Sequence, residues 1–152
     1  MTDCSRGAGV DLGVPAAAVF FLAEVSVEGE PMANRRWFIK ATGAVHFGEN
    51  KPPLDFAKLT KAPFNRPFGR RSIATIPPQE LSGFLAWIDA QGVFDHPAES
   101  EVPPDVTVHG GVDRWVVVRR GGRTSCVRLR PGAPLSETLK QRFGALVTAH
   151  MP

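Results

Sequence analysis

Basic and aromatic side chains are interleaved between residues 49 and 71. The members of this basic loop are Lys51, Lys58, Lys61, Arg66, Arg70 and Arg71, with Phe56, Phe64 and Phe68 between them. Two acids accompany the six cations, so the local excess of four positive charges is larger than the formal net charge of +3 of the whole chain. Cations beside aromatic faces can bind an acidic protein surface or single-stranded nucleic acid. The structural alternative is that the rings fasten the loop to the domain while the cations keep its outer side solvated.

A second group of cations surrounds the glycine pair Gly121-Gly122. Its members are Arg119, Arg120, Arg123, Arg128 and Arg130. A planar guanidinium group can bind a carboxylate or a phosphate through two hydrogen bonds at once. Arginine on an exposed strand also serves to prevent association between sheets, and this reading needs no partner.

We expect a non-enzymatic protein-binding module whose two basic groups bind an acidic protein surface. Inhibition of a protease is one form that this binding could take. The predicted partner-binding residues are Lys58, Lys61, Phe64, Arg66, Phe68, Arg70, Arg71, Arg119, Arg120 and Arg123. Nucleic acid is the alternative partner for the same residues. A net charge of only +3 favours the protein.

Histidine and acidic residues show no catalytic or metal-binding spacing. Residues 95–113 contain five acids and no Lys or Arg, but these acids do not follow the pattern of an EF-hand. The four histidines are scattered, and no Ser or Cys lies in a known nucleophile motif. We therefore expect no metal, no cofactor and no enzymatic activity. A small enzyme that uses His96 or His109 with a neighbouring carboxylate is the third hypothesis.

The composition fits one globular domain. With 152 residues, 43% of them hydrophobic, the chain is large enough for a core of its own. Residues 1–13 are rich in glycine and predict a flexible tail, which leaves residues 14–152 as a single domain. The apolar run Val14–Ala23 is too short to cross a bilayer.

Two cysteines cannot form a disulfide framework. An isolated Cys4–Cys126 disulfide is a minority alternative, because such bonds belong to oxidising compartments and the glycine-rich segment around Cys4 is expected to be flexible. We expect Cys126 to pack as a small apolar side chain and the protein to be cytoplasmic. Export or lipid anchoring through Cys4 is the minority alternative.

Alternation and turn residues place the expected elements. The alternation from Val19 to Val27 predicts a half-buried strand, and residues 36–47 predict a second one with a bulge or bend at Gly43. A helix follows from Pro78 to about Gly92. Its expected buried stripe is Leu81, Phe84, Leu85 and Ile88.

The C-terminal part reads as a hairpin followed by a helix. Glycines at positions 121 and 122 suit a two-residue turn, which would pair Arg120 with Arg123, Val118 with Ser125 and Val116 with Val127. The period then changes to that of a helix. Its expected apolar face is Leu135, Leu139, Phe143, Leu146 and Val147.

The predicted fold is therefore α+β, with the order strand, strand, helix, strand, strand, helix. We expect an antiparallel sheet of four strands with both helices on one face and the long basic loop after the second strand. Trp115 and Val117 would then point to the other face. Either the long loop or a second copy of the chain must cover them, so a homodimer is a possible state.

The second half of the chain resembles small bacterial domains of the emfourin type. The resemblance covers about residues 73–150. It consists of Pro78-Gln79-Glu80-Leu81 opening a helix, Gly92-Val93-Phe94 closing it, the strand Asp113–Val118 with its hairpin, and Pro134-Leu135 before the last helix. Emfourin-like proteins are metalloprotease inhibitors of simple sheet-and-helix build, so this resemblance implies inhibition. It identifies no inhibitory residue.

Overall fold

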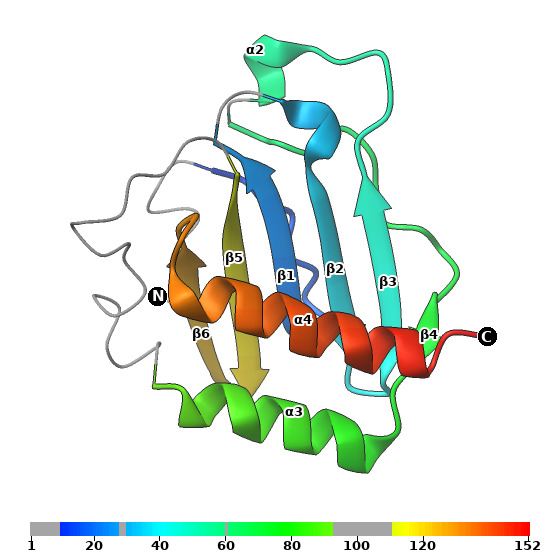
Figure 1. Ribbon diagram of the computed structural model, residues 1–152. Coiled ribbons are helices and arrows are strands. Elements are labelled where there is room, and N and C mark those ends of the chain that lie inside the picture. Colours follow the sequence, from blue (N-terminus) through cyan, green and yellow to red (C-terminus); the bar gives the residue numbers. More distant parts are fainter. Residues whose placement is uncertain (1–9, 28–29, 60, 93–110) are drawn as a thin grey trace.

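One antiparallel sheet forms the centre of the molecule. The structure is a computed structural model that describes residues 10–27, 30–59, 61–92 and 111–152. The strands are β1 (Ala18–Ser26), β2 (Arg35–Lys40), β3 (Ala44–Glu49), β4 (Ala74–Thr75), β5 (Val112–Arg120) and β6 (Arg123–Leu129), in the spatial order β4-β3-β2-β1-β5-β6. Helices α3 (Pro78–Ala90) and α4 (Pro134–Ala149) lie side by side on one face (Figure 1). The short elements η1 (Pro31–Ala33) and α2 (Phe56–Leu59) lie at one end of the sheet. The α+β class and the placement of both long helices agree with the prediction.

The sheet has six strands in the described residues, so the prediction of four was wrong. The segment expected as one strand, residues 36–47, is divided into β2 and β3 by a tight turn. Gly43 closes this turn with a φ of +90°, and a Cβ atom there would lie 2.0 Å from the Ile76 carbonyl oxygen. The turn therefore requires glycine. The other additional strand, β4, has only two residues and is too short to produce a recognisable alternation.

The C-terminal hairpin has the predicted register. Arg120 pairs with Arg123, Val118 with Ser125 and Val116 with Val127. Both turn glycines have a positive φ, as a two-residue turn requires. The predicted stripe of α3 is buried, and so are Leu139, Phe143 and Val147 of α4, while Leu135 and Leu146 are half-buried. The turn glycines and the helical period were therefore sufficient to predict the hairpin register and the buried faces of the two helices.

The first core lies between the sheet and the two helices. Phe20 of β1 is at its centre, with its ring centroid 5.0 Å from that of Phe84 in α3 and 5.2 Å from that of Phe143 in α4. Residues 20–23 of β1 have no exposed surface. β1 is therefore buried on both faces, whereas its alternation predicted a half-buried strand.

The second core lies on the opposite face of the sheet and is covered by the chain itself. Leu12, Phe64 and Phe68 pack against a layer of sheet side chains that includes Trp115 and Val117. Trp115 and Val117 are each 3% exposed. The long loop and the segment before β1 thus cover this face of the sheet. The sequence had left open whether the loop or a second copy of the chain would cover it. Leu12 is 1% exposed, so the packed domain begins inside the predicted tail.

Arg36 of β2 joins both covering segments to the sheet. Its Nη1 donates to the Leu12 carbonyl oxygen at 2.7 Å, and its Nη2 donates to that of Arg66 at 2.8 Å. The guanidinium carbon lies 4.6 Å from the ring centroid of Phe64 and 4.3 Å from that of Phe68. Burial lowers the pKa of Arg36 to about 10, an effect that Asp11 opposes, so the group stays charged at neutral pH.

Asparagine side chains fix the remainder of the basic loop. Asn50 donates to the carbonyl oxygens of Pro31 and Pro63 at 2.7 and 2.8 Å and accepts from the Asn65 backbone N–H at 2.8 Å. Asn34 also donates to the Pro63 carbonyl oxygen, at 3.0 Å. These bonds replace a regular ladder for an irregular backbone. The loop is therefore attached to the domain at several points.

Cys126 takes part in a disulfide bond. Cys126 packs against the second core, as expected of a small apolar side chain, but it is not a free thiol. The sequence contains one other cysteine, Cys4, which lies outside the described residues. A disulfide at Cys126 was the minority alternative from the sequence, because such bonds belong to oxidising compartments.

Membrane-spanning helices are absent from the part of the chain that the structure describes.

Replacing Arg36 should loosen both covering segments. Arg36→Met leaves two carbonyl oxygens without their donor, and we expect the free energy of unfolding to fall by about 2–4 kcal/mol. The matched control is Arg35→Met, because the Arg35 side chain is 51% exposed and its ion pair with Glu24 is long, at 3.6 Å. That variant should lose less than about 1 kcal/mol. Urea denaturation measures both; equal losses would contradict this role of Arg36.

Candidate functional site

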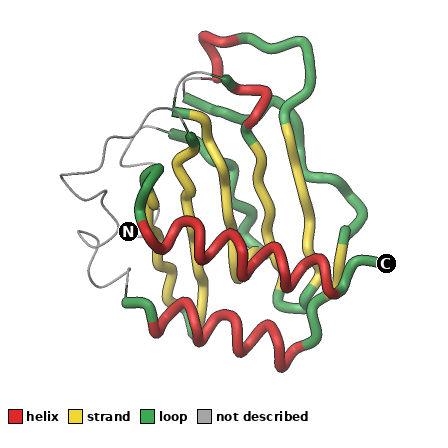
Figure 2. Tube along the Cα trace, viewed as in Figure 1, coloured by secondary structure: helices red, strands yellow, loops and turns green. Residues whose placement is uncertain are grey.

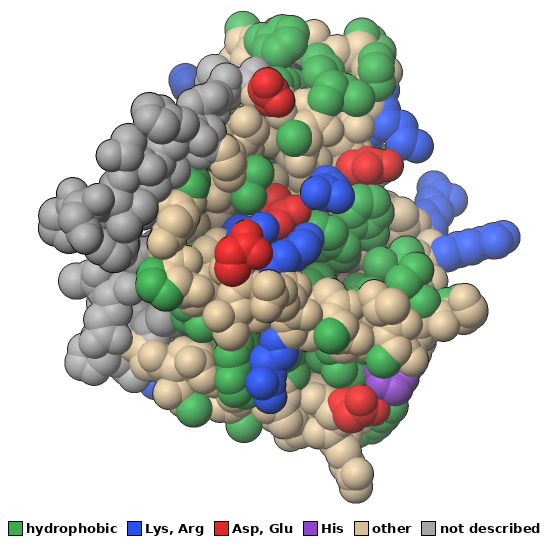
Figure 3. Space-filling model, in the orientation of Figure 1, with side chains coloured by type: hydrophobic (Ala, Val, Ile, Leu, Met, Phe, Trp, Pro, Cys, Tyr) green, Lys and Arg blue, Asp and Glu red, His purple; other side chains and the backbone are tan. Residues whose placement is uncertain are grey.

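Four predicted cations of the basic loop point outward. Lys58, Lys61, Arg70 and Arg71 are all exposed. The ion pairs between described residues use other cations, namely Arg35, Arg114, Arg120, Arg128, Arg130, Lys140 and His150. Figure 3 shows lysine and arginine side chains projecting from the side of the molecule at which β3 and β4 lie. A fixed loop thus presents these charges to solvent.

Three other predicted residues of the loop have structural contacts. Phe64 and Phe68 are half-buried in the second core, against the Arg36 guanidinium. Arg66 donates to the carbonyl oxygens of Asn65 and Pro52 at 2.9 and 3.1 Å. These two rings therefore fasten the loop to the domain, as the structural alternative predicted. Phe56, which was absent from the predicted set, is 62% exposed.

The arginines around the hairpin do not form one cluster. Arg119 donates to the carbonyl oxygens of Pro15 and Ala18 at 2.5 and 3.2 Å, so it fastens the segment before β1. Arg128 and Arg130 pair with Asp113 at the other end of β6. Only Arg120 and Arg123 stay beside the turn. This turn lies near α3, and α2 lies at the opposite end of the molecule (Figure 1, Figure 2), so the two basic groups do not form one surface.

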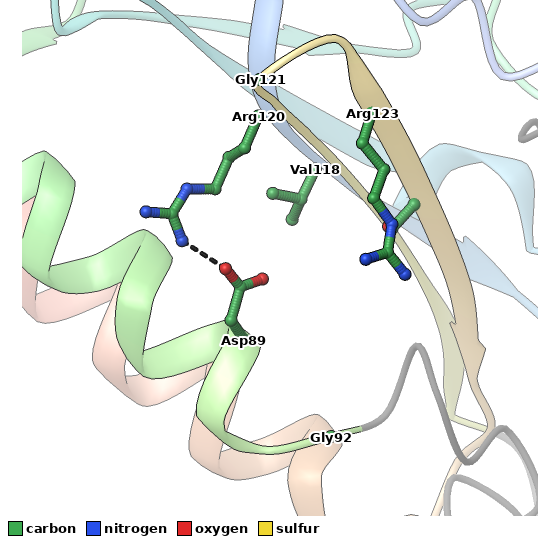
Figure 4. Close-up of a pocket in the computed structure, with 7 residues that line it drawn as sticks. Asp89, Gly92, Val118, Arg120, Gly121 and Arg123 are labelled. Atoms are coloured by element: carbon green, nitrogen blue, oxygen red, sulfur yellow. Dashed lines mark hydrogen bonds and ion pairs between the residues drawn. The ribbon is translucent and has the colours of Figure 1, made fainter.

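Arg120 and Arg123 line a hollow of about 600 Å³ between the end of α3 and the hairpin. In Figure 4 their side chains lie on either side of Val118, and Arg120 forms an ion pair with Asp89 of α3. The C-terminal end of a helix carries a partial negative charge, which adds to that of Asp89. The two arginines therefore offset negative charge at this place. This balance makes the hollow a weaker anion site than the arginines alone suggest.

A second cavity, of about 440 Å³, opens on the face of the second core. We call it the α2 cavity. Its lining residues are Val10, Val25, Ser26, Val27, Glu30, Pro31, Asn34, Phe56, Leu59, Pro63, Asp113, Trp115 and Arg128. They come from segments far apart in the sequence, so no local motif signals the cavity. An aromatic residue in a polar loop, Phe56, is the one signal that the sequence offers.

A buried carboxylate organises a group of charges on the helical face. Glu24 of β1 is 2% exposed. It accepts from Arg114 Nε at 2.8 Å and lies 3.2 Å from Lys140 Nζ and 3.6 Å from Arg35 Nε. Lys140 Nζ also lies 3.8 Å from the ring centroid of Trp37. Sequence alternation did not single out Glu24, because the covering of this face by α4 depends on the tertiary fold.

The Glu24 group is better explained by structure than by catalysis. Burial lowers the pKa of Lys140, while Glu24 opposes this shift by charge and hydrogen bonding. Arg114 also donates to Ser136 Oγ of α4 at 2.8 Å. The polar atoms therefore satisfy one another and join α4 to β1 and β5.

Histidines make no catalytic group among the described residues. His46 is buried, stacks on Phe38 and lies 2.8 Å from the Gly69 carbonyl oxygen through Nδ1. His150 pairs with Glu80. His96 and His109 lie outside the described residues, as do the acids from Asp95 to Asp105. In the described ranges, no three His, Cys, Asp or Glu side chains are grouped as metal ligands.

Comparison of the chain with protein-family models, with curated proteins and with solved structures found no match. Function is therefore inferred from the geometry of the charged loop and the cavities.

Removing the Glu24 carboxylate should leave three cations facing one another. We expect Glu24→Gln to lower the free energy of unfolding by about 3–5 kcal/mol, because the charges that it pairs are partly buried. The control is Glu137→Gln, since Glu137 binds the same Arg114 but its side chain is 72% exposed. Its loss should stay below about 1 kcal/mol.

Urea denaturation at neutral pH gives both values. The pKa of Lys140, followed by NMR of its side chain, should also fall further in Glu24→Gln, because the group that opposes the effect of burial is lost. Similar losses in the two variants, with an unchanged Lys140 pKa, would refute the central role of Glu24.

Proposed function

We propose that this protein is a non-enzymatic protein-binding module that binds an acidic protein surface through its basic loop. The observation that carries the proposal is a loop fixed by Arg36 and three asparagines that presents Lys58, Lys61, Arg70 and Arg71 to solvent. Hydrogen bonds already hold the described part of the loop in place, so less conformational entropy is lost when a partner binds. Rigid presentation of charge favours a specific partner over diffuse attraction.

Positive charge on a fixed loop mainly affects the rate of association. Exposed cations attract an acidic partner before contact, and salt weakens this attraction. Arg120 and Arg123 would form a separate, weaker contact region at the hairpin, because Asp89 offsets part of their charge. Arg119 is excluded from this role by its bonds to Pro15 and Ala18.

Nucleic acid is the second candidate partner. The exposed ring of Phe56 and the exposed cations of the basic loop are groups that a single-stranded base and its phosphates could use. The net charge of only +3 is small for a protein that binds nucleic acid, so it favours an acidic protein as the partner. An enzymatic role using His96 or His109 stays a third hypothesis, with its residues outside the described ranges.

Inhibition of a metalloprotease, which the emfourin-like resemblance implies, is one form that the protein binding could take. Incubation with a bacterial metalloprotease and a peptide substrate tests it directly. The disulfide at Cys126 favours an oxidising compartment over the predicted cytoplasm. A homodimer stays a prediction, for which analytical ultracentrifugation is the test.

Charge removal in the basic loop should weaken binding to an acidic polymer. We expect Arg70→Gln/Arg71→Gln and Lys58→Gln/Lys61→Gln each to reduce affinity for poly-L-glutamate by about threefold to tenfold at low salt. The control, Lys40→Gln/Arg142→Gln, removes the same net charge elsewhere and should reduce affinity by less than about twofold. Fluorescence anisotropy with labelled polymer gives the three affinities.

The same titrations with oligo-dT separate the two candidate partners. Tighter binding to oligo-dT than to poly-L-glutamate, with a steep linear fall of log affinity against log salt, would identify nucleic acid as the partner in place of an acidic protein. Equal weakening in all three double variants would show that only total charge matters, and the loop would then lose its proposed role.

A further inference from the structure

Large apolar side chains are exposed together at one end of the molecule. Among the described residues four such side chains are exposed, and three of them, Val27, Met32 and Phe56, lie at the end formed by η1 and α2 (Figure 1). We call these three side chains the apolar tip. They are 39%, 51% and 62% exposed, and the fourth, Met151, lies at the C-terminus. Figure 3 shows hydrophobic side chains gathered over the same end. Such a concentration is typical of an interaction surface.

The apolar tip is one surface, although its members come from two distant segments. Val27 and Phe56 both line the α2 cavity, and Met32 follows Pro31 of the same lining. Asn50 of the basic loop donates to the Pro31 carbonyl oxygen at 2.7 Å. Hydrogen bonding therefore holds η1 against the loop that carries Phe56.

The backbone beneath Phe56 is fixed with the ring directed outward. Asp55 Oδ1 accepts from the Ala57 backbone N–H at 3.1 Å at the start of α2. Asn65 Nδ2 donates to the Pro53 carbonyl oxygen at 3.1 Å. These bonds keep the segment from folding back over its own ring. The domain thus holds an aromatic ring in water, and a surface that covers the ring would recover the cost of its hydration.

Cations surround the apolar tip. Residues 51–66 contain one acid, Asp55, and four cations, namely Lys51, Lys58, Lys61 and Arg66. The three lysines are exposed. Glu28 and Glu30, which precede η1 in the sequence, bring the acids to three, so positive charge is still in excess. Lysine carries its charge on a long apolar stem, so an ammonium group can stay among polar headgroups while a neighbouring ring enters an apolar layer.

The floor of the α2 cavity is not open to an inserted side chain. Trp115 in the lining is 3% exposed, and the Arg128 guanidinium carbon lies 5.0 Å from its ring centroid. An anchor from a protein partner requires a pocket to fill, whereas a lipid surface requires only projecting apolar groups with cations around them. A second copy placed on α2 would bring the lysines of both chains together. The arrangement therefore favours a lipid surface.

We propose that the apolar tip inserts into the surface of a lipid bilayer and that the lysines around it bind anionic headgroups. Met32 and Phe56 would enter the boundary between the headgroups and the acyl chains, with Lys58 and Lys61 at the phosphates. An aromatic ring suits this boundary. Such binding at the surface requires no membrane-spanning helix.

This inference goes beyond the proposed function and uses a different surface. Arg70 and Arg71 lie between Gly69 and Ile73, whose backbone N–H groups both donate to carbonyl oxygens of β3 at 2.8 Å. They therefore lie along the edge of the sheet, whereas the apolar tip lies at its end. The tip lysines could serve either surface, and Arg70 and Arg71 belong to the protein contact alone.

Sedimentation with lipid vesicles tests the insertion. The probes are vesicles of phosphatidylcholine alone and of phosphatidylcholine with about one third phosphatidylglycerol, an anionic lipid. We expect the protein to bind the anionic vesicles and Phe56→Ser to bind them about fivefold to tenfold more weakly, because less apolar area is buried. Phe56 is largely exposed, so this variant should fold. The control is Met151→Ser, which removes a side chain that is 52% exposed and should change binding by less than about twofold.

Charge variants test the lysines. Lys58→Gln/Lys61→Gln should weaken binding to the anionic vesicles by about tenfold or more, and added salt should reduce the difference. The control, Lys40→Gln/Arg142→Gln, removes the same charge elsewhere and should weaken binding by less than about threefold.

A fluorescent side chain distinguishes insertion from electrostatic contact alone. In Phe56→Trp, vesicles with brominated acyl chains should quench the emission more strongly than in the unchanged protein. Its own Trp37 and Trp115 are 8% and 3% exposed, and Trp87 lies in α3, away from the apolar tip (Figure 1). Equal quenching in the two proteins would contradict insertion.

The outcomes separate this inference from the proposed function. If Phe56→Ser and Met151→Ser bind alike, or if the unchanged protein binds neither vesicle, membrane insertion is refuted and the acidic-protein proposal is unaffected. If ultracentrifugation shows a dimer that Phe56→Ser abolishes while vesicles are not bound, the apolar tip is a contact between copies and the membrane is refuted. Failure of the poly-L-glutamate titrations with vesicle binding intact refutes the proposed function alone.

Discussion

A buried guanidinium group makes the second face of this protein possible. The sheet carries apolar side chains on both faces, but the two long helices cover only one of them. The other is closed by two irregular segments, whose carbonyl groups need donors once they are buried. Arg36 supplies donors to both segments and a charged surface for two phenylalanine rings. The position of the part of the basic loop around Arg66 depends on this one side chain, while Asn34 and Asn50 hold the part around Pro63.

Turn residues and the spacing of apolar residues were sufficient to predict the structure where it depends on a short stretch of sequence. The hairpin register followed from Gly121-Gly122, and the buried faces of α3 and α4 followed from helical spacing. Gly43 shows where such rules fail. Its presence inside an alternating stretch is compatible with a bulge, a bend or a complete reversal. The structure shows the reversal, with Ile76 packed closely against the turn. Strand number was therefore less predictable than strand position.

The charged loop was visible in the sequence, but the roles of its members were not. Phe56, Phe64 and Phe68 all lie among the cations of one loop. Phe64 and Phe68 are half-buried and Phe56 is exposed, because only Phe64 and Phe68 lie against Arg36. The α2 cavity and the Glu24 group were missed for a similar reason. Each brings together residues from several strands and helices, and such contacts leave no local spacing to recognise.

The central position of β1 has a consequence for the order of folding. This strand precedes the other described strands in the chain, but one of its edges pairs with β5, which lies about ninety residues further along, as the bond from Arg114 to Glu24 illustrates. Its two faces also wait for α4 and the basic loop. A nascent chain that has not reached residue 112 therefore holds an apolar strand with one open edge, a state prone to pair with other chains. Completion of the last hairpin and helix protects the first strand during synthesis.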